Sequence, residues 1–226
     1  MAWLFSRTPE LVDPHDALAG GHAPVLEHPR PHTVLGTQID MPASDGRHSV
    51  IMGLGCFWGA EKLFWQLPGV ITTAVGYAGG VTPNPTYREV CTGRTNHAEV
   101  VRIVFDPQKI SLAEIVAQGL EAHDPTQGFR QGNDVGTQYR SVIYIEGDAA
   151  SDDAALAQRL VDQFGERLAA AGYGQITTEV APLAQTPAGE FYLAEDEHQQ
   201  YLDKNPGGYC PVHSTGVACG PVDEAH

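Results

Sequence analysis

Residues 49–69 read SVIMGLGCFWGAEKLFWQLPG, and this stretch decides the fold. Its first part, residues 49–54, is a short apolar run bounded by glycines, which predicts a central strand buried on both faces. Four apolar residues then follow at the i, i+3, i+4 and i+7 spacing of a helix, namely Ala60, Leu63, Phe64 and Leu67. Pro68-Gly69 ends that helix. Cys56 therefore stands between a buried strand and the N-terminus of a helix.

The rest of the chain shows the same two periodicities. Further strands are predicted at residues 70–77, 97–105, 139–145 and 176–181, and helices after the Ser111–Glu114 capping box and over residues 152–171. The stretches 78–87 and 123–138 predict loops. The first six elements run β-α-β-β-α-β. This order predicts an α+β two-layer sandwich with a ferredoxin-like core, its helices on one face of a largely antiparallel sheet.

The length of 226 residues suits a single domain, residues 1–226, with three parts. Residues 1–47 are rich in Pro, His and Gly without a sustained period and predict an irregular arm. Residues 48–185 form the α+β core. Residues 186–226 predict a Gly-rich coil tail, in which residues 205–208 place Pro and Gly at the central positions of a type II turn.

The composition excludes several classes of protein. A net charge of -15 repels phosphate backbones and anionic lipids, so nucleic acid and membrane surfaces are not expected partners. No apolar run is long enough to span a bilayer, and the first residues lack the features of a secretory signal. We therefore expect a cytoplasmic protein, and a monomer. The four cysteines form no Cys-x-x-Cys pair and are too few for a disulfide scaffold.

Cys56 has the surroundings of a nucleophile. Free N–H groups and the positive end of the helix macrodipole lower the pKa of a thiol at this position, although an inert buried thiol is the commoner role of cysteine. Phe57 and Trp58 precede the regular apolar stripe, so they are free to form an apolar wall that contacts sulfur favourably. Alternation in the strand 97–105 puts Glu99 on the face of its apolar set, where a carboxyl group keeps its proton to higher pH, unless the strand end is hydrated.

A thiolate and a carboxylic acid are the two groups that reduction of a sulfoxide requires. The thiolate attacks sulfur and ends as a sulfenic acid, which condenses with a nearby thiol, and a third thiol can move the resulting disulfide outward by exchange. Cys210 and Cys219 suit these two later steps because glycines surround them and allow movement.

Three sequence blocks, in this order, resemble the A-type peptide-methionine sulfoxide reductase family. They are Gly55-Cys56-Phe57-Trp58-Gly59, then Gly132-Asn133-Asp134 with Gly136-Thr137-Gln138-Tyr139-Arg140-Ser141, then His198-Gln199-Gln200-Tyr201 with Asn205-Pro206. The resemblance covers nearly the whole chain. It implies reduction of the S epimer of methionine sulfoxide, free or in oxidised proteins, with no cofactor and with thioredoxin or a similar dithiol as the reductant.

The resemblance also implies roles for single residues. Cys56 becomes the nucleophile and Glu99 the proton donor, while Tyr87 and Tyr139 donate hydrogen bonds to the sulfoxide oxygen. Phe57 and Trp58 hold the methyl group, and Asp134 and Tyr201 belong to the pocket. Cys210 and Cys219 become the resolving and recycling cysteines, through a Cys56–Cys210 and then a Cys210–Cys219 disulfide. The chain departs from the family pattern at Gly207, where an aromatic residue can occur, and in a longer loop between the late cysteines.

Two rival hypotheses remain open. Cys56 could pair with His97, His123 or His198 as a cysteine hydrolase, although a hydrolase has no use for two cysteines in a mobile tail. Alternatively, Cys91, His97, His123 or the late cysteines could bind a metal ion, but they lack the paired spacing of zinc sites. Cys91 itself reads as a structural thiol.

Overall fold

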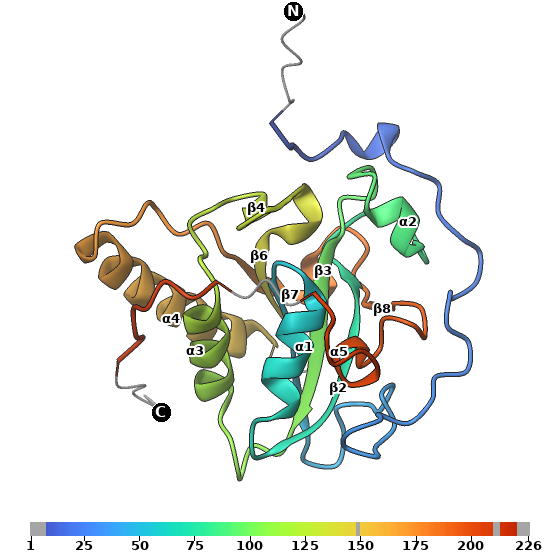
Figure 1. Ribbon diagram of the computed structural model, residues 1–226, viewed down its shortest axis with the longest axis horizontal. Helices are drawn as coiled ribbons and strands as arrows, with labels where there is room; N and C mark the ends of the chain where they lie inside the picture. The colour runs from blue at the N-terminus through green and yellow to red at the C-terminus, as the bar shows by residue number, and fades with distance from the viewer. Residues whose placement is uncertain (1–7, 148–149, 210–212, 221–226) are drawn as a thin grey trace, which may run out of the picture.

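The computed structural model describes residues 8–147, 150–209 and 213–220 (Figure 1). A six-stranded sheet contains β1 (His48–Leu54), β2 (Val70–Ala78), β3 (Ala98–Phe105), β6 (Ser141–Ile145), β7 (Glu179–Pro182) and β8 (Tyr192–Leu193). The strand order is β7-β6-β1-β3-β2-β8, and every neighbouring pair is antiparallel except β6 and β7. The helices are α1 (Phe57–Trp65), α2 (Tyr87–Val90), α3 (Leu112–Ala122), α4 (Ala150–Ala170) and α5 (Tyr201–Lys204).

The three longer helices cover one face of the sheet. Figure 1 shows α1, α3 and α4 together in front of the strands, and their apolar residues form one buried cluster with the strand residues that face them. A smaller cluster on the opposite face includes Ile51, Val100 and Tyr144, and Leu183 and Phe191 pack there. Both faces of β1 are therefore buried, as its uninterrupted apolar sequence predicts. The predicted α+β class is confirmed.

The register of the strands brings distant parts of the chain to one end of the sheet. Tyr77 near the end of β2 pairs with Glu99 near the start of β3, and Leu54 at the end of β1 pairs with Ser141 at the start of β6. Because neighbouring strands are antiparallel, the loop after β1 and the loop before β6 meet there. The loop holding Cys56 therefore lies at the same end as Glu99.

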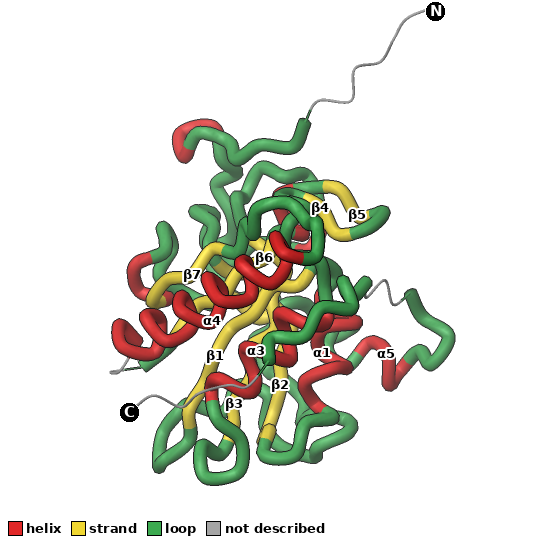
Figure 2. Tube along the Cα trace, turned by 90° about the vertical axis from the view of Figure 1, so that its left-hand side faces the viewer, coloured by secondary structure: helices red, strands yellow, loops and turns green. Residues whose placement is uncertain are grey.

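Short elements complete this end of the sheet, and the sequence patterns did not predict them. The hairpin of β4 (Arg130–Gln131) and β5 (Asp134–Val135) lies within the predicted loop 123–138 and is visible in Figure 2. Helix α2 begins at Tyr87, the last residue of the predicted loop 78–87 (Figure 1). The short β8 and α5 fall within the expected coil tail. Elements of two to four residues carry too little periodicity to be recognised and depend on tertiary contacts.

The turn at residues 205–208 differs from its prediction. Gly208 N–H does donate to the Asn205 carbonyl at 2.8 Å, which closes a turn. Gly207 is absent from the glycines with positive φ, whereas the third residue of a type II turn requires one. The turn is present, but its predicted type was wrong.

No helix in the described part of the chain has the length and apolar character needed to cross a membrane.

Candidate active site

Cys56 occupies the N-cap position of α1, directly after β1. Gly55 before it has φ of 96°, and a Cβ atom at that position would lie 2.7 Å from side-chain atoms of Gln131. Glycine is therefore required for the chain to turn from the strand into the helix. The backbone N–H groups of Trp58 and Gly59, in the first turn of α1, lie close enough to the Cys56 sulfur to lower the pKa of its thiol, although the Cys56 side chain forms no capping hydrogen bond. The predicted placement of Cys56 at a helix N-terminus is confirmed.

The predicted direction of the Cys56 pKa shift was wrong. The Trp58 and Gly59 N–H groups do lower the pKa of this thiol, but burial raises it by more, and the charge of an ionised Glu99 raises it further. The sequence shows that Cys56 stands at a helix N-terminus, which lowers a thiol pKa, but it does not show how far the tertiary fold removes water from the thiol. A neutral Glu99 removes only the second of these two contributions, and burial still raises the pKa of the thiol.

Glu99 is buried, with 1% of its surface exposed, so it is not the hydrated residue of a strand end. Its Oε2 accepts the Phe57 N–H at 3.2 Å, one residue from Cys56. Its Oε1 is buried without a hydrogen-bond partner among the described residues. Burial raises the pKa of Glu99 to about 8, the Phe57 N–H opposes that shift, and the charge of Asp134 adds to it. At neutral pH the carboxyl group is therefore mainly protonated and holds a proton beside the thiol.

Aromatic rings surround the first turn of α1. Trp58 stacks on Tyr201 with ring centroids 3.9 Å apart and planes 18° apart. Phe57 packs against Tyr87 at 6.3 Å and against His198 at 5.5 Å. The Trp58 indole nitrogen is buried without a hydrogen-bond partner in the described chain. The arrangement is an apolar wall beside the sulfur of Cys56, built from three segments far apart in sequence.

Two further predicted residues bring phenol groups to this end of the sheet. Tyr87 is the first residue of α2, which begins with a Thr86–Glu89 capping box, and its own N–H donates to Glu195 at 2.8 Å. Tyr139 ends the 3-10 helix Thr137–Tyr139 just before β6. Burial first, and then the charge of Glu99, raises the pKa of both phenols, so both remain protonated and able to donate.

Asp134 on β5 lies close enough to raise the pKa of Glu99 and of Tyr139 by its charge. Its Oδ1 accepts the Tyr209 hydroxyl at 3.2 Å, and its Oδ2 is buried and unpaired within the described residues. The structure thus brings together all the predicted residues on β3, α1, α2, β5, α5 and the 3-10 helix.

Sequence reasoning missed three residues of this site. His198, considered only as the base of a hydrolase, packs its ring against Tyr87 at 4.3 Å. Glu195 accepts the Tyr87 N–H and also the Tyr77 hydroxyl, at 3.0 Å, and so fixes the start of α2. Tyr209 binds Asp134. Two signals were available: His198 begins the third sequence block, and Tyr209 directly precedes Cys210.

Of the other cysteines, Cys219 lies apart from this constellation, Cys91 lies at its edge beside Tyr87, and Cys210 falls outside the described residues. Cys219 lies against α3, where its N–H donates to Glu121 Oε1 at 2.6 Å and its sulfur contacts the Ala117 carbonyl at 3.8 Å. Cys91 is exposed at the end of α2. Cys210 falls in a segment that the structure does not describe, so its predicted role stays a prediction.

Two of the three histidines of the hydrolase hypothesis are engaged elsewhere, and the third, His198, packs in the aromatic wall against Phe57 and Tyr87. Both ring nitrogens of His97 and of His123 are engaged, with Gly80 and Thr82 and with Gly119 and Ser141, respectively. Burial lowers the pKa of each ring to about 4. In the part of the chain that is described, no three His, Cys, Asp or Glu side chains are placed to hold a metal ion.

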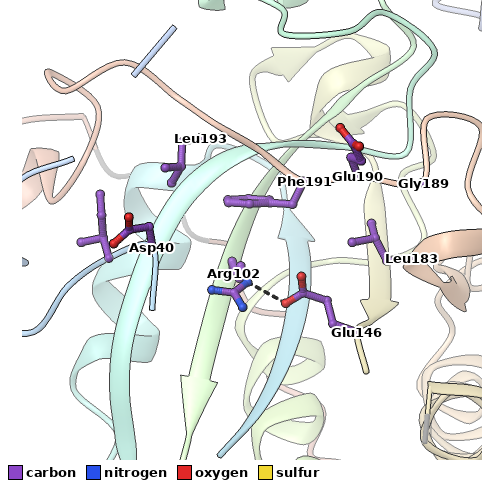
Figure 3. Close-up of a pocket in the computed structure, with 9 residues that line it drawn as sticks. Asp40, Arg102, Glu146, Leu183, Gly189, Glu190, Phe191 and Leu193 are labelled. Atoms are coloured by element: carbon purple, nitrogen blue, oxygen red, sulfur yellow. Dashed lines mark hydrogen bonds and ion pairs between the residues drawn. The ribbon is translucent and has the colours of Figure 1, made fainter. Parts of the chain in front are cut away.

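A cavity of about 380 Å³ lies elsewhere, against the second face of the sheet (Figure 3). Arg102 is its one cation, and that guanidinium is already paired with Glu146 at 2.6 Å and with the Met41 carbonyl at 2.8 Å. Phe191 and Leu183 line the same cavity. No cysteine lines it, so the chemistry belongs to the site around Cys56.

Comparisons with known proteins agree with this geometry. Residues 48–219 match the family described as "Peptide methionine sulfoxide reductase". The peptide methionine sulfoxide reductase MsrA of Corynebacterium kroppenstedtii is 64% identical over 222 residues, 97% of this chain and 100% of that protein. The solved structure of methionine sulfoxide reductase A of Corynebacterium diphtheriae is 62% identical, with a TM-score of 0.86 over 94% of this chain and 99% of that one. Reduced Mxr1 from Saccharomyces cerevisiae is 34% identical, with a TM-score of 0.65 over 76% of this chain and 93% of that one.

Proposed function

Because the chain belongs to the peptide methionine sulfoxide reductase family, we propose that Cys56 is the nucleophile and Glu99 the proton donor of that reaction. The protein is an oxidoreductase, a peptide-methionine (S)-S-oxide reductase. One observation carries the assignment of roles. The buried, unpaired Glu99 Oε1 belongs to a carboxyl group that is protonated at neutral pH and bonded to the residue after Cys56. Such a group is suited to protonate an oxygen that leaves sulfur.

The aromatic wall supports a position for the substrate. Trp58, Phe57 and Tyr201 offer an apolar surface on which the methyl group of methionine sulfoxide packs with favourable sulfur contact. Tyr87 and Tyr139 keep their protons and donate to the sulfoxide oxygen, as in an oxyanion site. This arrangement orients the sulfur toward Cys56 and the oxygen toward Glu99.

The first step then transfers oxygen between two sulfur atoms. Cys56 attacks the sulfoxide sulfur, Glu99 protonates the oxygen, and collapse leaves methionine and a Cys56 sulfenic acid. The methionine sulfur gains two electrons and the cysteine sulfur loses two, so no external reductant enters this step. Cys56 and Glu99 suit this step as a pair, because an uncharged Glu99 does not repel the Cys56 thiolate.

Recycling uses the late cysteines. Cys210 attacks the sulfenic acid and releases water, which gives a Cys56–Cys210 disulfide, and Cys219 then attacks the Cys210 sulfur and frees Cys56. A dithiol protein of the thioredoxin type reduces the resulting Cys210–Cys219 disulfide. Cys219 lies against α3 and stays partly exposed there, which supports its assignment to the step that meets an external partner.

The overall proposal is tested by mixing reduced protein with racemic methionine sulfoxide in the absence of a reductant. We expect methionine to form from the S epimer alone, together with the loss of two thiols per chain as a disulfide. Consumption of both epimers, or methionine formation without loss of thiols, would contradict it.

Replacement of Cys219 by alanine should separate chemistry from recycling. One rapid turnover should remain, because the sulfenic acid and Cys210 are intact, but steady-state turnover with thioredoxin should fall by roughly 100-fold, since the exchanging thiol is gone. The measurements are a rapid-quench single turnover and a steady-state assay. The Cys91→Ala variant is the matched control and should retain both rates. Full steady-state turnover without Cys219 would mean that recycling bypasses it.

A further inference from the structure

Glu61 is a fully buried carboxyl group in α1, with 0% of its surface exposed. It forms no ion pair within the described residues, and it is bound by donors instead. Gln200 donates its backbone N–H to Oε2 and its side-chain amide to Oε1, each at 2.8 Å. The Thr73 hydroxyl donates to Oε1 at 3.2 Å. A buried helix position usually carries an apolar side chain. Here it carries a carboxyl group that accepts hydrogen bonds from three donors.

The direction of these bonds follows from the neighbouring His32. Its Nδ1 accepts the N–H groups of Val34 and Leu35 at 3.1 Å, which assigns the ring proton to Nε2. Nε2 then donates to Thr73 Oγ1 at 2.9 Å, and the Thr73 proton points to Glu61. Every group that faces the Glu61 carboxyl is thus a donor, an arrangement that fits a carboxylate and offers no acceptor for a carboxylic proton.

Gln200 needs such a restraint because of its backbone conformation. It adopts φ of 47° and ψ of 42°, in the left-handed region that residues other than glycine rarely occupy. Tyr201 follows directly and stacks on Trp58. Trp58 and Glu61 stand three residues apart on α1, so they lie on the same side of the helix. Helix α1 thus contacts Tyr201 through Trp58 and contacts Gln200, the residue that orients Tyr201, through Glu61.

We propose that Glu61 is a positioning residue whose carboxylate holds Gln200 in the left-handed conformation and thereby sets Tyr201 against Trp58. The consequence is a preformed wall for the methyl group of the substrate. This inference rests on the proposed function, in which Trp58 and Tyr201 line the substrate pocket. Glu61 itself touches no reacting atom.

The surroundings of Glu61 connect this restraint to pH. Burial raises its pKa to about 7, opposed by the Gln200 and Thr73 donors and by the charge of Lys204 on α5. The arm contributes His32, whose pKa burial lowers to about 4, so that ring is neutral here. Asp203 on α5 is engaged by the Thr33 hydroxyl. Glu61 is therefore the group in this cluster that changes charge near neutrality, and its protonation as pH falls turns one of its two accepting oxygens into a hydroxyl that faces the donors of Gln200 and Thr73.

Glu61→Gln keeps the shape of the side chain and removes its charge. Its new amide group must place a donor against a donor of Gln200 or Thr73, so the wall should loosen. We expect KM for N-acetyl-methionine sulfoxide amide, which has no titrating group, to rise about tenfold. The maximal single-turnover rate should stay within about threefold, because Cys56 and Glu99 are untouched. Glu166→Gln, an exposed change on α4, is the matched control and should leave both values unaltered.

The pH dependence of the wild type supplies a second test that does not depend on how the variant folds. KM of the wild type should rise as pH falls through about 7, and Glu61→Gln, whose side chain does not titrate, should show no such rise. An unchanged KM in a folded Glu61→Gln variant, a flat wild-type KM between pH 6 and 8, or an equal loss in KM and rate would each overturn the inference. Failure of the wild type to reduce the substrate would instead contradict the proposed function.

Discussion

Replacement of Cys56 by serine is expected to abolish reduction of methionine sulfoxide. A hydroxyl group at this position is a far weaker nucleophile toward sulfur and cannot form a sulfenic acid or a disulfide. The N–H groups of Trp58 and Gly59, the aromatic wall and Glu99 all remain, but they have no thiolate to act with. We expect the single-turnover rate to fall by at least roughly 10⁴-fold, the scale seen when a covalent nucleophile is removed.

Cys91→Ser provides the control for this loss. Cys91 is an exposed thiol at the end of α2, close enough to Tyr87 to raise the pKa of that phenol. If exposure alone made a thiol reactive, Cys91 would be the better candidate. Full activity in Cys91→Ser together with none in Cys56→Ser supports the assignment, and appreciable turnover by Cys56→Ser would remove it.

Glu99→Gln is expected to slow the chemical step by about 10²-fold to 10³-fold, the range for loss of a general acid. The amide preserves the shape and can still accept the Phe57 N–H, but it has no proton of suitable acidity to give to the oxygen. The wild-type single-turnover rate should rise with pH as Cys56 ionises and should stop rising near pH 8, because above its pKa of about 8 Glu99 loses the proton that it must give. The variant should show no such break in its profile. Rapid-quench measurements of methionine formed between pH 6 and 9.5 give both results.

The stability of the same variant separates lost chemistry from lost folding. Folded Glu99 keeps its proton to about pH 8, whereas an unfolded glutamate releases it near the ordinary value of 4.5. The stabilising contribution is therefore full below pH 4.5 and is lost as pH rises toward 8. At pH 8, Glu99→Gln should unfold at a higher temperature than the wild type while reacting more slowly. An unchanged pH profile of the rate would remove Glu99 from its role as acid.

The core elements could be predicted because their signals are local. The apolar run that became β1, the alternation around Glu99 in β3 and the Ser111 capping box of α3 each fall within a few residues. By contrast, α2, β8 and the β4–β5 hairpin are short and rest on contacts such as the Glu195 bond to Tyr87. The Thr86–Glu89 capping box is a local signal from which the start of α2 could have been predicted.

The candidate site shows the same division. Cys56 could be placed at a helix N-terminus from sequence, because strand, glycine and helix follow one another there. The direction of its pKa shift could not, since desolvation depends on how separate segments close over it. Glu61 shows this most clearly. The apolar stripe predicted for this helix includes Leu63 and not Glu61, yet Glu61 is buried in α1. Its burial depends on hydrogen-bond donors from Thr73 and Gln200, which lie far along the chain.

The most direct test of the account traps the product of the first step. A variant with both Cys210 and Cys219 replaced by serine cannot resolve a sulfenic acid, so the oxidised thiol should persist. This variant is mixed with one equivalent of the S epimer of N-acetyl-methionine sulfoxide amide, then with dimedone, and its peptides are mapped. We expect one N-acetyl-methionine amide per chain and a dimedone adduct on Cys56, with Cys91 unmodified. Methionine formed without an adduct on Cys56, or an adduct found on Cys91 instead, would contradict it.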